Sequence, residues 1–200
     1  MDNTIYIQGF HSLMTEPLED KALRLQLKQA GVEGRRMSRF SQLALLGALP
    51  LQEHIKPDTA IYLASSFASP SKFNKMFWQV NDQQCPSPLD FMANLNNAAT
   101  FHLAQQLATQ GSTIFLAVNQ INYWQPLKLA LMDLQQNPNG TNLVGWAFEH
   151  YQQGQMEGSC WLLLSKKSEN AIAKLNWQKL TALSNDEQFL QPLHNIMELM

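Results

Sequence analysis

The chain has 200 residues, of which 45% are hydrophobic and 15% are charged, and its formal net charge is −2. This composition excludes a disordered chain and is typical of one domain with a single core, and the near-neutral charge does not favour nucleic-acid binding. No apolar run is long enough to span a membrane, and the N-terminus has no signal-peptide pattern. We therefore expect a cytoplasmic protein that binds neither nucleic acid nor a membrane.

Apolar runs of strand length alternate along the chain with segments of helical periodicity. In chain order, the sequence predicts a strand at 4–9, a helix that follows Ser38 and runs to 49, a strand at 59–64, a short helix ending near 80, a helix at 94–110, a strand at 113–118, a helix at 124–136, and strands at 142–149 and 158–165. Residues 10–34 are polar and poorly patterned, and we assign no element there. The alternation and the closing strand pair predict an α/β fold with a mixed sheet.

The predicted helix at 94–110 is apolar nearly all the way round its axis. Its large apolar side chains are those of Leu95, Phe101, Leu103 and Leu107, and alanines lie between them. A helix of this kind is expected to pack on more than one side.

Several stretches resemble β-ketoacyl synthases, in the order in which that family has them. The most specific is Arg-Arg-Met-Ser-Arg-Phe-Ser-Gln-Leu-Ala at 35–44, which is similar to the family's Arg-Met-Asp/Ser-Arg-Phe helix start. Weaker matches cover the first strand with Gly9, residues 58–69, 101–104, Gly111, 114–118, 143–149 and 159–165. The resemblance implies the N-terminal half of a thiolase-type fold over residues 1–165, with a mixed five-stranded sheet and helices on both faces. Residues 166–200 are then a C-terminal tail, which we expect to be helical.

Residues 94–98, Asn-Leu-Asn-Asn-Ala, resemble the nucleophile segment of a group of short synthase-like proteins, which carry Ser-Val-His-Asn-Ala there. That group is associated with aryl polyene and related type II polyketide or fatty-acid gene sets. The family places a catalytic cysteine at the start of a buried helix, where the helix dipole lowers the pKa of the thiol. The resemblance puts Asn94 at that position, and a carboxamide is no acyl acceptor.

This comparison predicts a vestigial nucleophile turn formed by Asn94, Asn96 and Asn97, with no catalytic residues. Asparagine is a good N-cap, so we expect these side chains to satisfy backbone groups at the start of the helix. The family's two catalytic histidines belong to the second half of the fold, which the match does not reach. Of the two cysteines, Cys160 is expected in a buried strand, and neither it nor Cys85 lies at the nucleophile position.

Other candidate sites are weaker. Arg35, Arg36 and Arg39 form one basic cluster, which fits a solvated helix start; a docking site for an acidic carrier protein is the alternative. His102 is predicted to be a core histidine with its polar atoms satisfied. The five histidines show no metal-ligand spacing, so we expect neither a metal nor another cofactor. The five tryptophans fit core or interface positions better than a ligand cage.

Three functions remain open from the sequence. The first is a non-catalytic synthase-like subunit of a carrier-protein-dependent fatty-acid, aryl polyene or polyketide pathway. The second is an independent acyl-carrier-protein or acyl-CoA binding module, and the third is a small acyl-processing enzyme with an unrecognised site. We expect a homodimer or a heterodimer with a β-ketoacyl synthase, because half of the fold would leave its central helix covered on one side and a dimer-edge strand at 113–118 unpaired.

Overall fold

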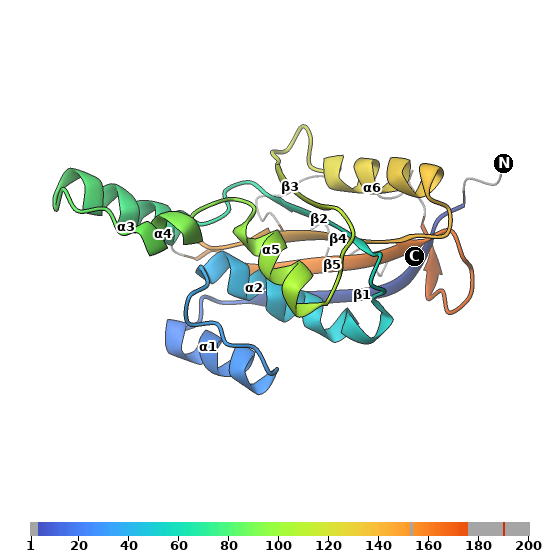
Figure 1. Cartoon of the computed structure of the whole chain (residues 1–200), viewed down its shortest axis with the longest axis horizontal. Coiled ribbons are helices and arrows are strands. Elements are labelled where there is room, and N and C mark those ends of the chain that lie inside the picture. Colours follow the sequence, from blue (N-terminus) through green and yellow to red (C-terminus); the bar gives the residue numbers. More distant parts are fainter. Residues whose placement is uncertain (1–3, 153, 176–189, 191–200) are drawn as a thin grey trace.

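A computed structural model describes residues 4–152, 154–175 and 190, and a single sheet organises them (Figure 1). The strands are β1 (Tyr6–Thr15), β2 (Ala60–Ser65), β3 (Thr113–Ala117), β4 (Thr141–Phe148), β5 (Glu157–Ser165) and β6 (Ala173–Lys174). The helices are α1 (Asp20–Gln29), α2 (Arg39–Ala48), α3 (Pro70–Asn81), α4 (Pro88–Ala93), α5 (Ala98–Gln106), α6 (Gln125–Gln136) and the 3₁₀ helix η1 (Leu49–His54).

The sheet is mixed, and its strand order is β3-β2-β4-β5-β1-β6. β2 pairs in parallel with β3 and β4, whereas the pairs from β4 to β6 are antiparallel. Both central strands, β4 and β5, are buried along their whole length. The predicted α/β fold with a mixed sheet is therefore confirmed, but the described residues form six strands instead of five because Ala173–Lys174 pairs with the start of β1.

Two apolar layers enclose the sheet. One face is covered by α2 and α5, where Phe40, Leu103 and Trp161 are buried, and the other is covered by α6, where Tyr123 and Trp146 are buried (Figure 1). Helices on both faces were expected, and the structure confirms them.

The polar stretch after Gly9 is better ordered than its sequence indicates. β1 continues to Thr15 and pairs with β5 as far as Glu157, and α1 then buries Leu23 and Leu27. Most of β1 is only half-buried, so polar residues such as His11 and Ser12 obscure the strand pattern. The prediction of no element at 10–34 was therefore wrong.

The C-terminal tail is described only in part. Residues 173–174 form a strand at the sheet edge, where no strand was predicted. The predicted tail helices, Trp177 and His194 lie outside the described residues.

Helices α3 and α4 form a hairpin that projects from the body of the molecule, at the left of Figure 1. We call residues 70–93 the arm. Its first helix begins earlier than expected, at Pro70, and its second was not predicted at all. Proline at the first helical position and the Ser87 hydroxyl, which accepts the backbone N–H of Asp90, account for the start of α4.

Candidate functional site

The turn before α5 is where the sequence places the vestigial nucleophile. The helix begins at Ala98, four residues later than expected, and Asn94 instead ends α4, where its N–H bonds the carbonyls of Asp90 and Phe91. Asn97 is at the N-cap of α5, but its side chain makes no capping hydrogen bond, so the predicted capping by Asn97 is wrong. The dipole of a helix acts mainly on the residues of its first turn. Because Asn94 lies before the first turn of α5, it is not at the position where the dipole would lower the pKa of a thiol.

Neither cysteine lies at the start of α5. Cys160 is fully buried in β5, which confirms the prediction of a buried strand residue. Its sulfur lies 3.0 Å from the Ser12 hydroxyl. Burial raises the pKa of the Cys160 thiol to about 11, so this sulfur stays protonated and is a poor nucleophile. Cys85 is exposed in the loop between the two helices of the arm.

The three arginines of the basic cluster have different surroundings. Arg39 is buried, and its guanidinium donates to Glu157 through Nε (2.8 Å) and Nη2 and to Asp20 through Nη1 (2.7 Å). These ion pairs occupy Arg39, so it does not offer a free cation to a partner. Arg35 and Arg36 are exposed, and the predicted docking of an acidic carrier protein rests on these two.

Two buried glutamates at the ends of β4 and β5 were missed by the sequence analysis. Glu157 accepts Arg39 and also lies 2.8 Å from Nδ1 of His150. The carboxylate of Glu149 accepts the backbone N–H of Phe40, at the start of α2, and that of Ser71, at the start of α3, each at 3.0 Å. For Glu149, its place directly after the apolar run at 143–148 was the signal that pointed to a buried, partnered carboxylate.

Glu149 is wholly buried, and burial raises the pKa of its carboxyl, although its hydrogen bonds and the charge of Arg39 oppose that shift. Because each of its two oxygens holds the N-terminus of a different helix, Glu149 fastens the base of the arm to the body of the molecule.

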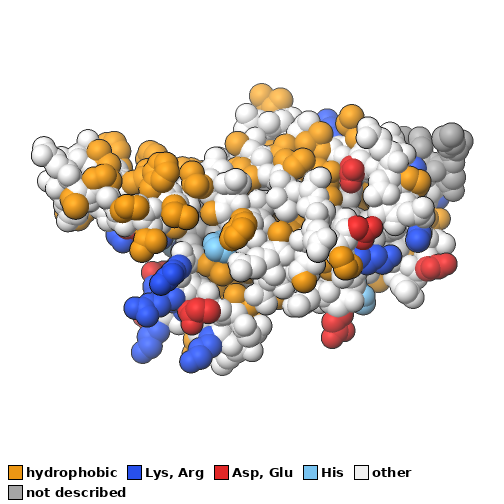
Figure 2. Space-filling model, in the orientation of Figure 1, with side chains coloured by type: hydrophobic (Ala, Val, Ile, Leu, Met, Phe, Trp, Pro, Cys, Tyr) orange, Lys and Arg blue, Asp and Glu red, His pale blue; other side chains and the backbone are white. Residues whose placement is uncertain are grey.

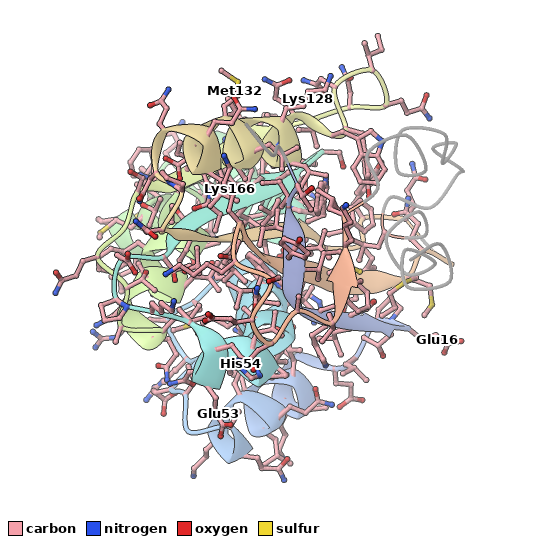
Figure 3. All side chains as sticks on the ribbon, turned by 90° about the vertical axis from the view of Figure 1, so that its right-hand side faces the viewer. Glu16, Glu53, His54, Lys128, Met132 and Lys166 are labelled. Carbon is pink, nitrogen blue, oxygen red and sulfur yellow. The ribbon has the colours of Figure 1, made fainter. Side chains whose placement is uncertain are left out.

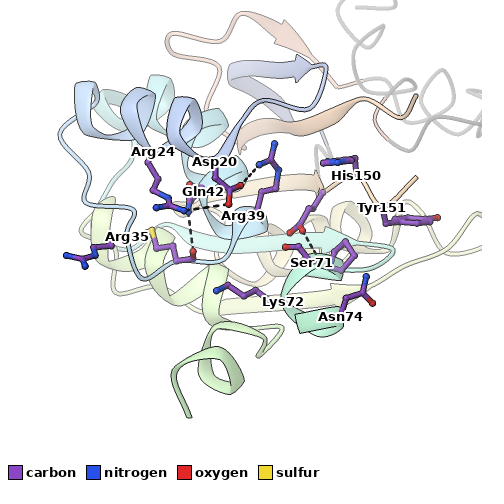
Figure 4. A pocket seen from close by; sticks show the side chains of 13 residues that line it. Asp20, Arg24, Arg35, Arg39, Gln42, Ser71, Lys72, Asn74, His150 and Tyr151 are labelled. Carbon is purple, nitrogen blue, oxygen red and sulfur yellow. Dashed lines mark hydrogen bonds and ion pairs between the residues drawn. The ribbon is translucent and has the colours of Figure 1, made fainter. Parts of the chain in front are cut away.

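A polar pocket of about 330 Å³ opens beside these residues, between α1, the starts of α2 and α3, and the segment after β4 (Figure 4). Arg35, Lys72 and Tyr151 are among the side chains that line it. Gln42 also lines it, and the Oε1 atom of Gln42 is buried with no hydrogen-bond partner. The lining is charged and polar, so this pocket suits a small polar or anionic group and not an acyl chain.

His102 differs from its prediction. It is half-buried in α5, and its Nδ1 atom is buried without a hydrogen-bond partner, so it is not the satisfied core histidine that we expected. Burial lowers the pKa of the His102 imidazole. Within the described residues no three acidic, histidine or cysteine side chains come together as metal ligands, and no helix has the length and apolar character to cross a bilayer.

Apolar side chains remain exposed on α5 and on the neighbouring edge strand. On α5, Ala99 and Leu103 face the core whereas Phe101 is exposed, and Leu95 is exposed in the turn before the helix. Among the described residues the helix is therefore covered on one side, and the prediction that it packs on more than one side was wrong. β3 is the last strand on its side of the sheet, and Ile114 on it is exposed.

The arm carries most of the other large exposed apolar side chains (Figure 2). They are Phe73, Phe77, Trp78, Val80, Leu89, Phe91 and Met92. The sequence analysis missed this surface, although the aromatic spacing of Phe73 and Phe77, four residues apart, gave a signal. The tryptophans were predicted to lie in the core or at an interface. Trp124, Trp146 and Trp161 are in the core, and the exposed Trp78 has the position expected of an interface residue.

No protein-family model and no curated protein sequence matches this chain. Solved structures do match it. A chain in the structure of the ketosynthase ApeO with its chain length factor ApeC from Xenorhabdus doucetiae superposes with a TM-score of 0.60 at 16% identity, over 82% of this chain and 79% of that chain.

Two further structures are similar. The ishigamide ketosynthase/chain length factor gives a TM-score of 0.66 at 16% identity, over 84% of this chain and 63% of that chain. A complex of the type II polyketide synthase AntDE:AntF, an acyl-carrier protein with its ketosynthase bound to the hexaketide, gives 0.66 at 11% identity, over 84% and 64%. The chain thus spans less than two thirds of the length of these two. At such identities the likeness establishes the fold, and this chain has the thiolase-type fold of ketosynthases and chain length factors.

Proposed function

We propose that this protein is a non-catalytic ketosynthase-like subunit that pairs with a ketosynthase in a carrier-protein-dependent polyketide, aryl polyene or fatty-acid pathway. The observation that carries the proposal is the start of α5, where the family resemblance places a catalytic thiol and this chain has asparagine and alanine. A condensing enzyme needs a thiolate to accept the acyl group, and a carboxamide cannot ionise to replace it.

The two thiols of the chain do not restore the chemistry. The raised pKa of Cys160 and its burial keep it unreactive, and Cys85 lies in a loop between the arm helices and not at the start of α5. The proposed role is therefore structural: the chain shapes or stabilises a partner that performs the condensation.

The pairing is supported by the exposed apolar surface and by the nature of the similar structures. Leu95 before α5, Phe101 on α5 and Ile114 on the edge strand β3 are exposed, and exposed apolar side chains that gather into a patch mark protein interfaces. Two of the similar structures are complexes of a ketosynthase with a chain length factor. A ketosynthase is accordingly the partner that this fold suits best.

A carrier protein is a second proposed contact. Arg35 and Arg36 are exposed together near the polar pocket, and they would attract an acidic carrier protein to this face. The alternative function, an independent acyl-binding module, finds less support, because the pocket beside these arginines is polar and an acyl chain needs an apolar one.

Acyl transfer to the protein tests the loss of catalysis. The purified chain is incubated with acyl-carrier protein and with acyl-CoA, and intact-mass spectrometry is used to look for a covalent adduct. We expect none, whereas a catalytic ketosynthase treated in parallel gains one acyl group. A stoichiometric acyl-enzyme on any residue of this chain would contradict the proposal, and mapping it would identify the nucleophile.

A further inference from the structure

The arm has its polar side chains inside and its apolar side chains outside. Apart from Pro70, the buried residues of α3 and α4 are Gln79 and Asp90. By contrast, Phe77, Leu89 and Met92 are each more than 60% exposed. A helical hairpin that is stable by itself buries its aromatic side chains between its helices. The arm exposes them, so we infer that its outer surface contacts another molecule.

A network of charges and hydrogen bonds joins the two arm helices. The Asp90 carboxylate accepts the ammonium groups of Lys72 at 2.9 Å and Lys75 at 2.8 Å and the amide of Gln79 at 3.0 Å. The amide oxygen of Gln79 in turn accepts the backbone N–H of Ser87, which caps α4. The side chains of Asp90 and Gln79 are both hydrogen-bonded, so this network holds the two helices together without using the apolar surface of the arm.

The base of the arm is also fixed. Glu149 holds the N-terminus of α3, and Phe67 packs edge-to-face against Phe73 (5.7 Å between ring centroids) and Tyr151 (6.4 Å). Phe73 stacks on Phe77 further out (6.4 Å). The aromatic surface thus runs from the body of the molecule along the arm in a fixed orientation, and a preorganised surface loses little conformational entropy on binding.

The composition of the arm favours a protein partner over a membrane or an acidic carrier protein. Residues 70–93 contain two lysines and two aspartates, and both lysines are engaged by Asp90. A helix that lies on a membrane surface presents free basic residues beside its apolar face, and so would a surface for an acidic protein. The exposed face of the arm combines aromatic and methionine side chains with uncharged Asn and Gln, which is the composition of interface cores.

The arm projects away from its own sheet, and among the described residues its outer apolar side chains remain exposed (Figures 1 and 2). Leu95, two residues after the arm, and Phe101, in the helix that follows, are also exposed. We infer that the arm is a preformed docking element that inserts into an apolar groove on the ketosynthase partner, and that Asp90 is the positioning residue that holds it in the docking conformation. This inference rests on the proposed pairing with a ketosynthase.

The test uses the whole chain, tagged and co-expressed with each β-ketoacyl synthase encoded in its genome of origin, followed by affinity measurement on the captured pair. The double variant Phe77→Ser/Leu89→Ser is expected to weaken binding by at least about tenfold, because exposed aromatic anchors dominate interface energetics. Asp90→Asn leaves every apolar side chain in place and is expected to weaken binding too. In that variant, faster hydrogen exchange over residues 70–93 is the sign of a positioning role.

Leu25→Ser in α1 and Met132→Ser in α6 are matched controls, because these side chains are as exposed as those of the arm but lie on other faces of the molecule; they should bind as the parent does. Met92→Gln provides a milder arm variant if the double variant does not fold. Should the parent chain capture a ketosynthase and the arm variants bind it equally well, the docking role of the arm is overturned while the proposed function stands. Capture of no ketosynthase by the parent overturns both, and arm-dependent flotation with phosphatidylcholine/phosphatidylserine vesicles would replace the protein partner with a membrane.

Discussion

Arg39 joins three parts of the chain that are far apart in sequence. Its guanidinium binds Glu157 at the start of β5, Asp20 at the start of α1 and the carbonyl of Leu18, and it is itself at the start of α2. Glu157 is wholly buried, so the pair is a buried ion pair in which each charge depends on the other. The resemblance at 35–44 therefore identified a residue with a structural role, and the same geometry removes Arg39 from the docking cluster.

Removal of this arginine should destabilise the fold strongly. Arg39→Met leaves the Glu157 carboxylate buried with His150 as its remaining partner, and we expect a loss of about 3–5 kcal/mol in the free energy of unfolding. Chemical denaturation followed by circular dichroism measures it. Arg24→Met, which breaks an exposed ion pair with Asp20, should cost less than about 1 kcal/mol. Equal losses in the two variants would show that burial of the Arg39–Glu157 pair contributes nothing.

The helices and strands that were predicted correctly are those with a clear hydrophobic pattern or a recognisable cap. β4 and β5 contain long apolar runs and were located to within a residue or two. α2 follows its Ser38 cap as expected, with the Ser38 hydroxyl accepting the N–H of Ser41. The second half of β1 and the whole of α1 were missed because few of their residues are buried, so polar positions obscure the hydrophobic periodicity.

The arm and the polar site could not be found by the same reasoning. The helices of the arm bury polar residues and expose apolar ones. Sequence analysis recognises a helix by assuming that its apolar face is the buried one, and the arm does the opposite. The partners of Glu149 come from segments about 80 and 110 positions away, so only the folded chain brings them together. The start of α5 was misplaced by four residues because Asn94 and Asn97 suit a turn as well as a cap.

The stability of the arm should depend on pH through Asp90. The ammonium group of Lys75 and, next to it, that of Lys72 hold the pKa of the Asp90 carboxyl well below its usual range, against the opposing effect of burial. A lowered pKa in the folded state means that the ionised carboxylate stabilises the arm above the unfolded value of about 3.9, and that this contribution is lost as the pH falls through and below that value.

Asp90→Asn tests this dependence. At pH 7 the substitution should lower the opening free energy of residues 70–93 by about 1 kcal/mol, since the ion pairs that it removes are partly exposed. As the pH falls from 4 to 2.5 the difference between the parent and the variant should shrink, because the unfolded carboxyl is protonated there while the folded one still loses only part of its charge. Hydrogen exchange of residues 70–93, corrected for its intrinsic pH dependence, measures the opening free energy of the arm at each pH. A difference that is constant from pH 2.5 to 7 would mean that the hydrogen bond to Gln79, and not the charge of Asp90, holds the hairpin.

For the whole molecule, one edge of the sheet combines an edge strand with exposed apolar side chains. The core residues of the described chain fill both faces of the sheet, but β3 leaves one row of backbone N–H and C=O groups unpaired, and Ile114, Leu95 and Phe101 lie near that edge or on the helix beside it. Figure 3 views the molecule from the end opposite the arm, where the charged Glu16, Glu53 and Lys128 and the exposed Met132 are labelled. Exposed apolar side chains next to an edge strand are a common starting point for association.

We therefore predict that the purified chain, without a ketosynthase, does not remain a monomer at micromolar concentration. An uncovered edge strand with apolar neighbours pairs readily with a second copy, and a two-fold arrangement would bury the same surface on both. Light scattering should give a mass above that of one chain. Ile114→Lys places a charge on the edge strand and should shift the mass toward the monomer, whereas Met132→Lys, on the exposed side of α6, should leave it unchanged. A monodisperse monomer that also fails to bind any ketosynthase would show that the edge and α5 are compatible with water, and that the argument for an obligatory partner is wrong.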